Sequence, residues 1–362
     1  MQMTESVAPY EYYKGQFGTA DIVTIDVGGG TSDVVISSNN KVEYITSFRF
    51  AANSIFSNTL NATNNRLNGI IRMFMGNIKS RLDDNNLMDL HNVFKQIEAS
   101  LNSADMASFF FSLPENKAII EKNICNSVDF SDMLQRDDKH KITFILFYTA
   151  IIYHVACIMK GKNHKMPRYI AFSGNGSKVV PIVSEDKALM SDFTKRIFEF
   201  VYGEKYCSDG LELIFNQKSP KEATCKGGIS CDASIFSQTH DDCKVILRSA
   251  DNKTFACETD TYDKIDDAYI NSVVEQTKSF VDLFFNLNKT LKFSDNFGVD
   301  TDSVKIAEDV CRRDIEVFVR NGLEQRRNEV GIDQPVEETL FFYPIIGIMN
   351  ALADKISEKN GK

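Results

Sequence analysis

The sequence predicts an α/β protein, because short strand-like runs near the N-terminus and again in mid-chain alternate with helical patterns. Two such runs flank Gly28-Gly29-Gly30, and a third follows Ser38-Asn39-Asn40, which indicates an antiparallel meander. From Ala52 to about Arg136 apolar residues recur at helical spacing, and a further strand, turn and helix begin near residue 168. We therefore expect a sheet covered by helices, with a helical insertion between its strands.

Each expected strand is a short run of β-branched and aromatic residues bounded by Gly, Asn or Asp. These strands cover residues 21–26, 31–37, 41–48, 168–173 and 211–215, with two more at 244–248 and 253–258. The expected helices cover residues 142–159 and 186–202, begin at about 177 and 219, and include long ones at 266–288, 302–322 and 336–357. Phe341 to Ile346 predicts a helix that enters the core, with an exposed patch that meets a partner as the alternative.

Length and charge divide the chain. Its 362 residues, 43% of them apolar, suffice for two compact domains or for one with a large elaboration. We expect a short leading segment at 1–20, a lobe at 21–230 with a helical insertion at about 66–136, and an acidic, mostly helical region at 231–362. The last region holds 25 acidic and 16 basic residues, which accounts for the whole net charge of −9. A chain without surplus Lys and Arg is a poor partner for nucleic-acid phosphates, so none is expected.

Residues 142 to 159 form an uncharged run that lysines flank on both sides, which raises the question of a membrane span. The run contains polar residues such as Thr149 and His154, and it leads within about ten residues into a strand. A buried core helix is therefore the favoured interpretation, and no membrane partner is expected.

The eight cysteines include no C-x-x-C pair, and no His is placed to complete a zinc site. No charged segment followed by an apolar run opens the chain. We therefore expect free thiols and a cytoplasmic protein.

The run Asp26-Val27-Gly28-Gly29-Gly30-Thr31-Ser32-Asp33 places three glycines between two strands, with an acid at each end. Glycines let backbone amides approach a phosphate closely and can adopt positive φ, and two carboxylates suit Mg²⁺. Neither the Walker loop nor the dinucleotide fingerprint fits, since no Gly-Lys-Ser/Thr ending and no following helix is present. On its own the turn is as consistent with a plain hairpin as with a phosphate site.

This octapeptide resembles the second phosphate motif of the superfamily of ATPases that includes actin, sugar kinases and heat-shock chaperones. Phe172-Ser173-Gly174-Asn175-Gly176-Ser177-Lys178 is similar to the adenosine motif of that family, and the segment from Ser219 to Gly228 is similar to its second connecting helix. Glu5-Ser6-Val7-Ala8-Pro9 weakly resembles the first connecting helix. The resemblance implies a ribonuclease H-like lobe and an ATP- and Mg²⁺-dependent activity that depends on positioning and charge rather than on a covalent nucleophile. Consistent with this, the sequence shows no Ser-His-Asp or Cys-His arrangement.

The resemblance also implies roles for individual residues. Asp26 and Asp33 would hold Mg²⁺ through its waters, and Glu5 would act with Asp26 in catalysis by orienting the metal shell or the attacking water. The residues that would hold the β- and γ-phosphates are Gly28, Gly29, Gly30 and Thr31, and those that would lie against ribose and adenine are Gly174, Gly176, Ser177 and Lys178.

The family also has a first phosphate motif more than a hundred residues upstream, whereas only 25 residues precede Asp26. We expect the chain to be the second lobe of a longer ATPase that lacks its first lobe here, with a natural single-lobe protein as the alternative. Such a lobe would bind adenine nucleotides weakly and be nearly inactive alone. Two other functions stay open: a filament-forming or scaffold protein regulated by nucleotide, with a protein partner or self-assembly, and a small-molecule kinase of the same superfamily.

Overall fold

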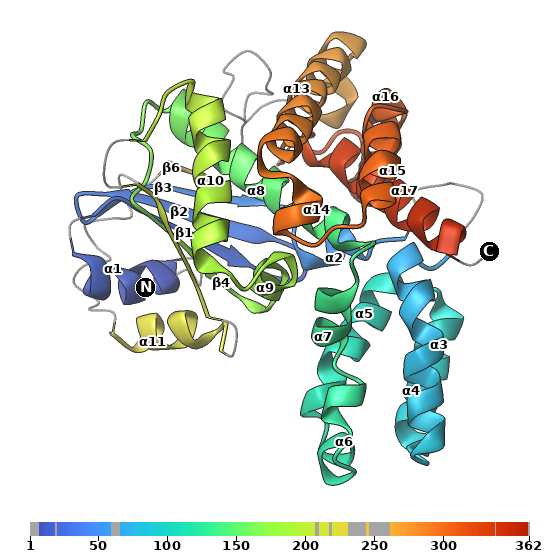
Figure 1. The fold of residues 1–362 in the computed structure, drawn as a ribbon. Helices are drawn as coiled ribbons and strands as arrows, with labels where there is room; N and C mark the ends of the chain where they lie inside the picture. The colour runs from blue at the N-terminus through green and yellow to red at the C-terminus, as the bar shows by residue number, and fades with distance from the viewer. Residues whose placement is uncertain are drawn as a thin grey trace.

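A computed structural model describes residues 7–18, 20–58, 66–206, 210–216, 219–230, 244–245, 261–336 and 338–360. Its centre is a mixed sheet with the strand order β5-β4-β1-β2-β3-β6 (Figure 1). The fold class predicted from the sequence, α/β with a sheet covered by helices, is confirmed at this level.

The first three strands form the predicted antiparallel meander. They are β1 (Ile22–Val27), β2 (Ser32–Ser38) and β3 (Lys41–Phe48), with β1 and β2 joined by the glycine turn. Strands β4 (Tyr169–Ser173) and β5 (Glu212–Phe215) extend the sheet parallel to β1, and all five lie within one residue of their predicted bounds. The short β6 (Lys244–Val245) pairs with β3 in parallel. The rest of the strands predicted at 244–248 and 253–258 lies outside the described residues.

Alternation along the strands gives the sheet two faces. Val23, Ile25 and Val34 belong to the large core, which also contains helices α8 (Lys141–Gly161) and α10 (Lys187–Tyr202). On the opposite face, Val35 packs with Val7 and Tyr10 beside α1 (Ala8–Phe17). Helix α11 (Glu222–Ser230) lies against α1 on that face (Figure 1).

The predicted helical run between 66 and 136 forms an arm that projects away from the sheet (Figure 1). It consists of α3 (Gly69–Asp84), α4 (Met88–Ser100), α5 (Ser103–Ser112), α6 (Lys117–Glu121) and α7 (Phe130–Arg136). Asn or Asp side chains accept amide hydrogen bonds at the starts of α3, α5, α6 and α7, which fixes where those helices begin. Phe94, Phe110 and Phe130, all fully buried, form the core of the arm.

The C-terminal region is helical, as expected, but two predicted boundaries are wrong. Helix α13 (Asp267–Leu291) matches the prediction, and the short α14 (Phe293–Asn296) follows it. The single helix predicted at 302–322 is two helices, α15 (Thr301–Cys311) and α16 (Ile315–Val330), because Asp314 adopts a left-handed conformation with φ 56°. The helix predicted at 336–357 is α17 (Phe342–Asn360), since Pro335 pairs with Thr261 in an isolated bridge before it.

Helix α8 is the one described helix long and apolar enough to cross a membrane, and 94% of its most apolar window is buried within the protein. This burial agrees with the predicted core helix. Phe341 and Phe342 are buried as well. Phe341 packs edge-on against Phe280 and Phe342 stacks on Phe48, so the prediction that this segment enters the core is confirmed. Cys125, Cys157, Cys225 and Cys311 are free thiols, and the other four cysteines lie outside the described residues.

Candidate functional site

The glycine turn is held by its carbonyl groups. The amide of Gly28 donates to the carbonyl of Thr31 at 2.9 Å and closes the turn. The next helix, α2 (Ala52–Ile55), then docks on it: the amide of Ala52 donates to the Gly28 carbonyl at 3.3 Å, and that of Asn53 to the Gly29 carbonyl at 2.9 Å. The turn therefore has a fixed shape that does not use its remaining amides.

Those remaining amides belong to Gly29, Gly30 and Thr31. Within the described part of the chain none of them has a hydrogen-bond acceptor. All three residues are exposed. Successive unpaired amides in one turn can form a donor surface that binds anions. The turn therefore offers donors to an anion such as phosphate.

The expectation that these glycines use positive φ is wrong, because none of the three does. Their small size matters in other ways. A Cβ on Gly28 would lie 3.1 Å from the Thr31 carbonyl oxygen, so glycine suits the closed turn. A Cβ on Gly30 would meet nothing within 4 Å, so that position accepts a side chain and leaves space for a ligand.

Asp26 and Asp33 are directly opposite each other in the β1–β2 ladder. The Asp26 Oδ2 atom accepts hydrogen bonds from the Ser173 hydroxyl at 2.9 Å and from the Thr224 hydroxyl at 3.1 Å, which directs it towards α11. Like charges at facing positions repel, and a bound cation relieves that repulsion. Among the described residues there is no group of three or more potential metal-ligating side chains. Two carboxylates alone suit Mg²⁺, which binds proteins through one or two acids and keeps most of its waters.

The second glycine-rich segment packs directly on the first. Gly174 has φ 80°, and a Cβ there would lie 2.4 Å from both Asp26 Oδ1 and the Val27 carbonyl oxygen. A Cβ on Gly176 would lie 2.5 Å from the Gly28 carbonyl oxygen. Only glycine permits this contact at either position. The structure therefore brings together the two motifs that lie almost 150 residues apart in the sequence.

A short 3-10 helix, η4 (Asn175–Lys178), continues that segment. The Ser177 side chain is buried there, and its hydroxyl donates to the Gly174 carbonyl at 2.7 Å, so it stabilises the turn from within. Lys178 is partly exposed and pairs with Glu115 of the helical arm at 3.9 Å. Of the four residues expected to contact the nucleoside, Gly176 and Lys178 line a cavity, whereas Gly174 and Ser177 lie behind its surface.

That cavity has a volume of about 380 Å³ and lies between the two turns and the arm. Gly28, Gly29, Asn175, Gly176 and Lys178 line one side of it, and Asn53 lies at the start of α2. On the α5 side the lining combines apolar side chains with serine hydroxyl groups, from Ala107, Ser108, Phe111 and Ser112. An aromatic ring and small residues on one side, with backbone donors on the other, form a pocket that suits a flat base joined to an anion.

Helices α1 and α11 contact each other through their backbones. A Cβ on Gly227 would lie only 1.7 Å from the Ala8 carbonyl oxygen, so a glycine is required at the crossing. The two segments that resemble connecting helices therefore pack closely against each other. Glu5, the other residue expected to act in catalysis, lies outside the described residues.

Three groups of this site were not predicted from the sequence. Thr224 lies in the segment that resembles the second connecting helix, but nothing in the sequence indicated that it would contact Asp26. Ser173 faces Asp26 in the parallel β1–β4 register, a signal that becomes readable once the strand order is known. The α5 residues of the cavity carry no motif.

The expectation that no Ser-His-Asp arrangement exists is also wrong in geometric terms. His140 Nδ1 lies 2.7 Å from Asp137 Oδ2, and His140 Nε2 lies 3.0 Å from the Ser357 hydroxyl. His140 is fully buried, and none of these residues lines a described cavity. The arrangement joins the start of α8 to α17, and we interpret it as structural.

Comparison of the chain with protein-family models gave no match, and neither did comparison with curated proteins.

Proposed function

We propose that this chain is the nucleotide-binding lobe of an ATP- and Mg²⁺-dependent ATPase of the actin-like or chaperone-like kind. The observation that carries the proposal is the row of amides at Gly29, Gly30 and Thr31 that have no acceptor among the described residues, with Gly29 lining the 380 Å³ cavity. Exposed amides in a turn whose shape is held by other contacts can exchange water for a ligand that supplies the acceptors. Phosphate oxygens are such acceptors.

The carboxylate pair supports the Mg²⁺ part of the proposal. Ser173 and Thr224 fix the Asp26 carboxylate, and Asp33 lies opposite it. In the proposed complex both carboxylates accept hydrogen bonds from water bound to Mg²⁺, which neutralises part of the phosphate charge. Phe111 and the small residues of α5 would contact the base, and Lys178 would lie beside it.

The strand order supports a ribonuclease H-like lobe. Three antiparallel strands are followed by β4 and β5, which are added in parallel beside β1. The connections carry α8 and α10 on one face, and α1 and α11 cover the other. In the proposed whole protein the first lobe supplies the first phosphate motif and closes on the nucleotide. We therefore expect weak binding and negligible hydrolysis by this chain alone.

A thermal-melt series tests the proposal. The chain is melted with Mg-ADP, Mg-ATP, Mg-GTP and AMP up to about 10 mM, which stabilises a site with a Kd of about 100 μM by roughly 2.7 kcal/mol at hundred-fold excess. The test variant is Gly30→Asp, which brings a negative charge to the free amides. Its matched control is Gly30→Asn, which has nearly the same shape and no charge.

We expect both Mg-bound adenine nucleotides to raise the midpoint for the wild type and for Gly30→Asn, and not for Gly30→Asp. Equal responses of the two variants would contradict phosphate binding at the turn. A wild-type chain that melts cooperatively but responds to no nucleotide would favour the scaffold alternative.

One observation favours a small-molecule kinase as a second candidate. A cavity of about 360 Å³ lies beside Gly30 and is lined by Arg49, Arg326 and Glu338. Burial raises the pKa of the Glu338 carboxyl, although the Tyr343 hydroxyl donates to it at 2.8 Å and Arg326 pairs with it at 3.1 Å. A carboxylate of raised basicity can accept the proton of a hydroxyl substrate.

Phosphorus NMR of Mg-ATP mixed with pooled polyols and hydroxy acids tests this second candidate. A new phosphoester signal that Glu338→Gln abolishes would support it. ATP that stays intact would contradict it.

A further inference from the structure

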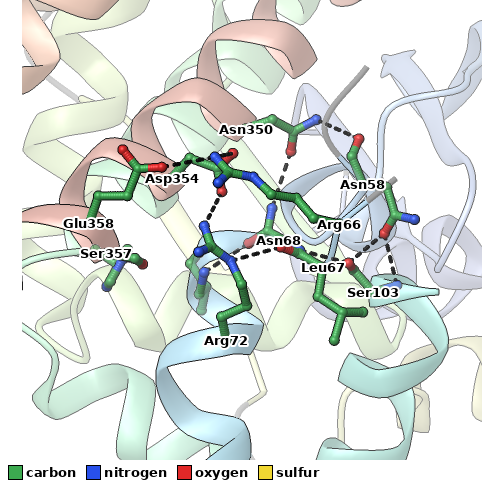
Figure 2. Close-up of polar contacts among 12 residues, drawn as sticks. Asn58, Arg66, Leu67, Asn68, Arg72, Ser103, Asn350, Asp354, Ser357 and Glu358 are labelled. Carbon is green, nitrogen blue, oxygen red and sulfur yellow. Dashed lines mark hydrogen bonds and ion pairs between the residues drawn. The ribbon is translucent and has the colours of Figure 1, made fainter. Parts of the chain in front are cut away.

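Helix α17 pairs with the segment that leads into the helical arm. The Asp354 carboxylate binds two arginines through different oxygens: Oδ1 accepts from Arg72 at 2.6 Å, and Oδ2 accepts from Arg66 at 2.8 Å (Figure 2). Arg66 also reaches Glu358, one turn further along α17, at 3.0 Å. The Asp354 side chain is 7% exposed, so this is a nearly buried, charge-assisted contact.

A second contact lies one helical turn earlier, at Asn350. Its side-chain nitrogen donates to the Asn58 carbonyl at 3.2 Å, and its side-chain oxygen accepts from Asn68 at 3.2 Å (Figure 2). Asn68 in turn caps α3, since its side-chain oxygen accepts from the Ile70 amide at 2.9 Å. Both asparagines are 1% exposed. Leaving such groups unpaired is costly, so the cluster has one preferred arrangement.

From Asn58 the hydrogen bonds continue to α5. The Asn58 side chain accepts from the Ser103 amide at 3.0 Å and donates to the Leu101 carbonyl at 2.6 Å. The Ser103 hydroxyl accepts from the Asn68 amide at 2.8 Å. Ser103 is the first residue of α5, the helix that lines the 380 Å³ cavity. A connected set of buried and partly buried polar contacts thus links α17 to the start of α5 (Figure 2).

Two further contacts strengthen this link: a close backbone approach between α3 and α17, and a hydrogen bond from α17 to the segment that follows the arm. A Cβ on Gly69 would lie 2.2 Å from the Ala353 carbonyl oxygen, so the start of α3 and the middle of α17 touch directly. At the other end of the arm, the Ser357 hydroxyl binds His140 at 3.0 Å, immediately before α8. Helix α17 therefore holds the arm at the point where it leaves the core and at the point where it returns.

We infer that α17 positions the α5 side of the nucleotide cavity, with Asp354 and Asn350 as positioning residues that set affinity for the nucleoside part of the ligand. This inference rests on the proposed function. The glycine turn is held by β1, β2 and the first residues of α2, and the end of α2 is bound by Asn68 and Asn350 through the Ile55 carbonyl and Ser57. Asp354 binds Arg66 and Arg72 instead, so the phosphate subsite depends on Asp354 less directly than α5 does. Loosening the Asp354 contact should therefore weaken binding of a nucleotide and leave binding of a bare polyphosphate unchanged.

The test compares Mg-ADP with Mg-tripolyphosphate by isothermal titration of the full chain. The variants are Asp354→Asn, which removes the charge, and the milder Arg72→Gln, whose side chain is 31% exposed and which serves if the first fails to fold. The control is Lys355→Gln on the same helix, since Lys355 pairs with Asp309 of α15 at 3.4 Å and not with the arm. Amide hydrogen exchange in α5 is recorded for each protein.

We expect about a tenfold rise in the Kd for Mg-ADP in both variants, an unchanged Kd for tripolyphosphate, and faster exchange in α5. The control should match the wild type. If the variants bind both ligands as the wild type does, or lose both equally, the inference is overturned while the proposed function stands. If the wild type binds tripolyphosphate but not Mg-ADP, or binds neither, the proposed function fails and the inference fails with it.

Discussion

Two polar regions of this chain differ in how far their hydrogen bonds are satisfied. We call the contacts between α17 and the start of the helical arm the α17 junction. There Asn68, Asn350 and Asp354 are buried, and they bind one another or arginine side chains. At the glycine turn, the amides of residues 29, 30 and 31 are exposed and have no acceptor within the described chain. Satisfied polar groups stabilise one arrangement, whereas unsatisfied donors held in a fixed shape suit a ligand. The contrast therefore separates a structural cluster from the turn that we propose as a binding site.

The largest expected effect concerns the junction. Gly69→Ala places a methyl group about where the Ala353 carbonyl oxygen lies, so α3 and α17 must separate. We expect a loss of about 3 kcal/mol in the free energy of unfolding. Gly76→Ala is the matched control, because it makes the same change in the same helix where a Cβ meets nothing within 4 Å, and it should stabilise the chain by up to about 1 kcal/mol. Urea unfolding measures both, and equal effects would contradict the close contact.

A second prediction concerns pH and the aromatic cluster that holds the start of α17. Burial lowers the pKa of His154 to about 3, and its ring contacts Phe48, Phe341 and Phe342. The unfolded chain therefore binds a proton near pH 6.5 that the folded chain does not, so stability is full above that pH and falls below it. Between pH 8 and pH 5 this one group should cost roughly 2 kcal/mol.

His154→Phe removes that group, so it should flatten part of the fall in unfolding free energy over the same range. Urea unfolding at several pH values measures the slope. A variant with the slope of the wild type would show that His154 is protonated in the folded state.

The third prediction concerns the glycine turn and the charge of the Asp26 carboxylate beside it. Asp26→Asn retains a side-chain oxygen for the Ser173 and Thr224 hydroxyls but removes the charge. We expect a change in stability below about 1 kcal/mol and a loss of the Mg²⁺ dependence of nucleotide binding. Titration of ADP with and without Mg²⁺ checks this, and a variant that still needs Mg²⁺ would remove Asp26 from the metal site.

The smallest effect is expected at the ion pair across the cavity. Lys178 and Glu115 are 3.9 Å apart, and the Glu115 side chain is 82% exposed. Solvent screens such a pair, so Glu115→Gln should change the unfolding free energy by less than about 0.5 kcal/mol. A thermal melt is sufficient to check it, and a large loss would mean that this contact, rather than α17, holds the arm.

Local signals in the sequence predicted the parts of the fold that local chemistry determines. Gly28 to Gly30 and Asn39-Asn40 mark two strand ends, and all five longer strands lie within one residue of their predicted positions. The break at Asp314 was missed because the apolar spacing continues across it. The left-handed residue that ends one helix and begins the next carried no glycine signal.

The candidate site also has parts that were predicted from the sequence and parts that were not. The two glycine turns were predicted from composition and spacing, and they do meet, because Gly174 and Gly176 permit backbone contact with Asp26 and Val27. The α5 side of the cavity and the α17 junction could not be predicted. The contacts that hold α5 join residues 35 and 45 positions apart, and those of the α17 junction join residues more than 280 positions apart, such as Arg72 and Asp354. No short sequence pattern records such pairings.

The most direct measurement is the response of individual glycine amides to nucleotide. With the chain labelled with ¹⁵N-glycine and Gly30→Ala used for assignment, the amide signals of Gly29 and Gly30 are followed while Mg-ADP is added. We expect these two signals to shift in proportion to occupancy, while those of Gly76 in α3 and Gly203 at the end of α10 stay in place. Binding of Mg-ADP that leaves Gly29 and Gly30 unshifted would contradict the assignment of the turn as the phosphate site.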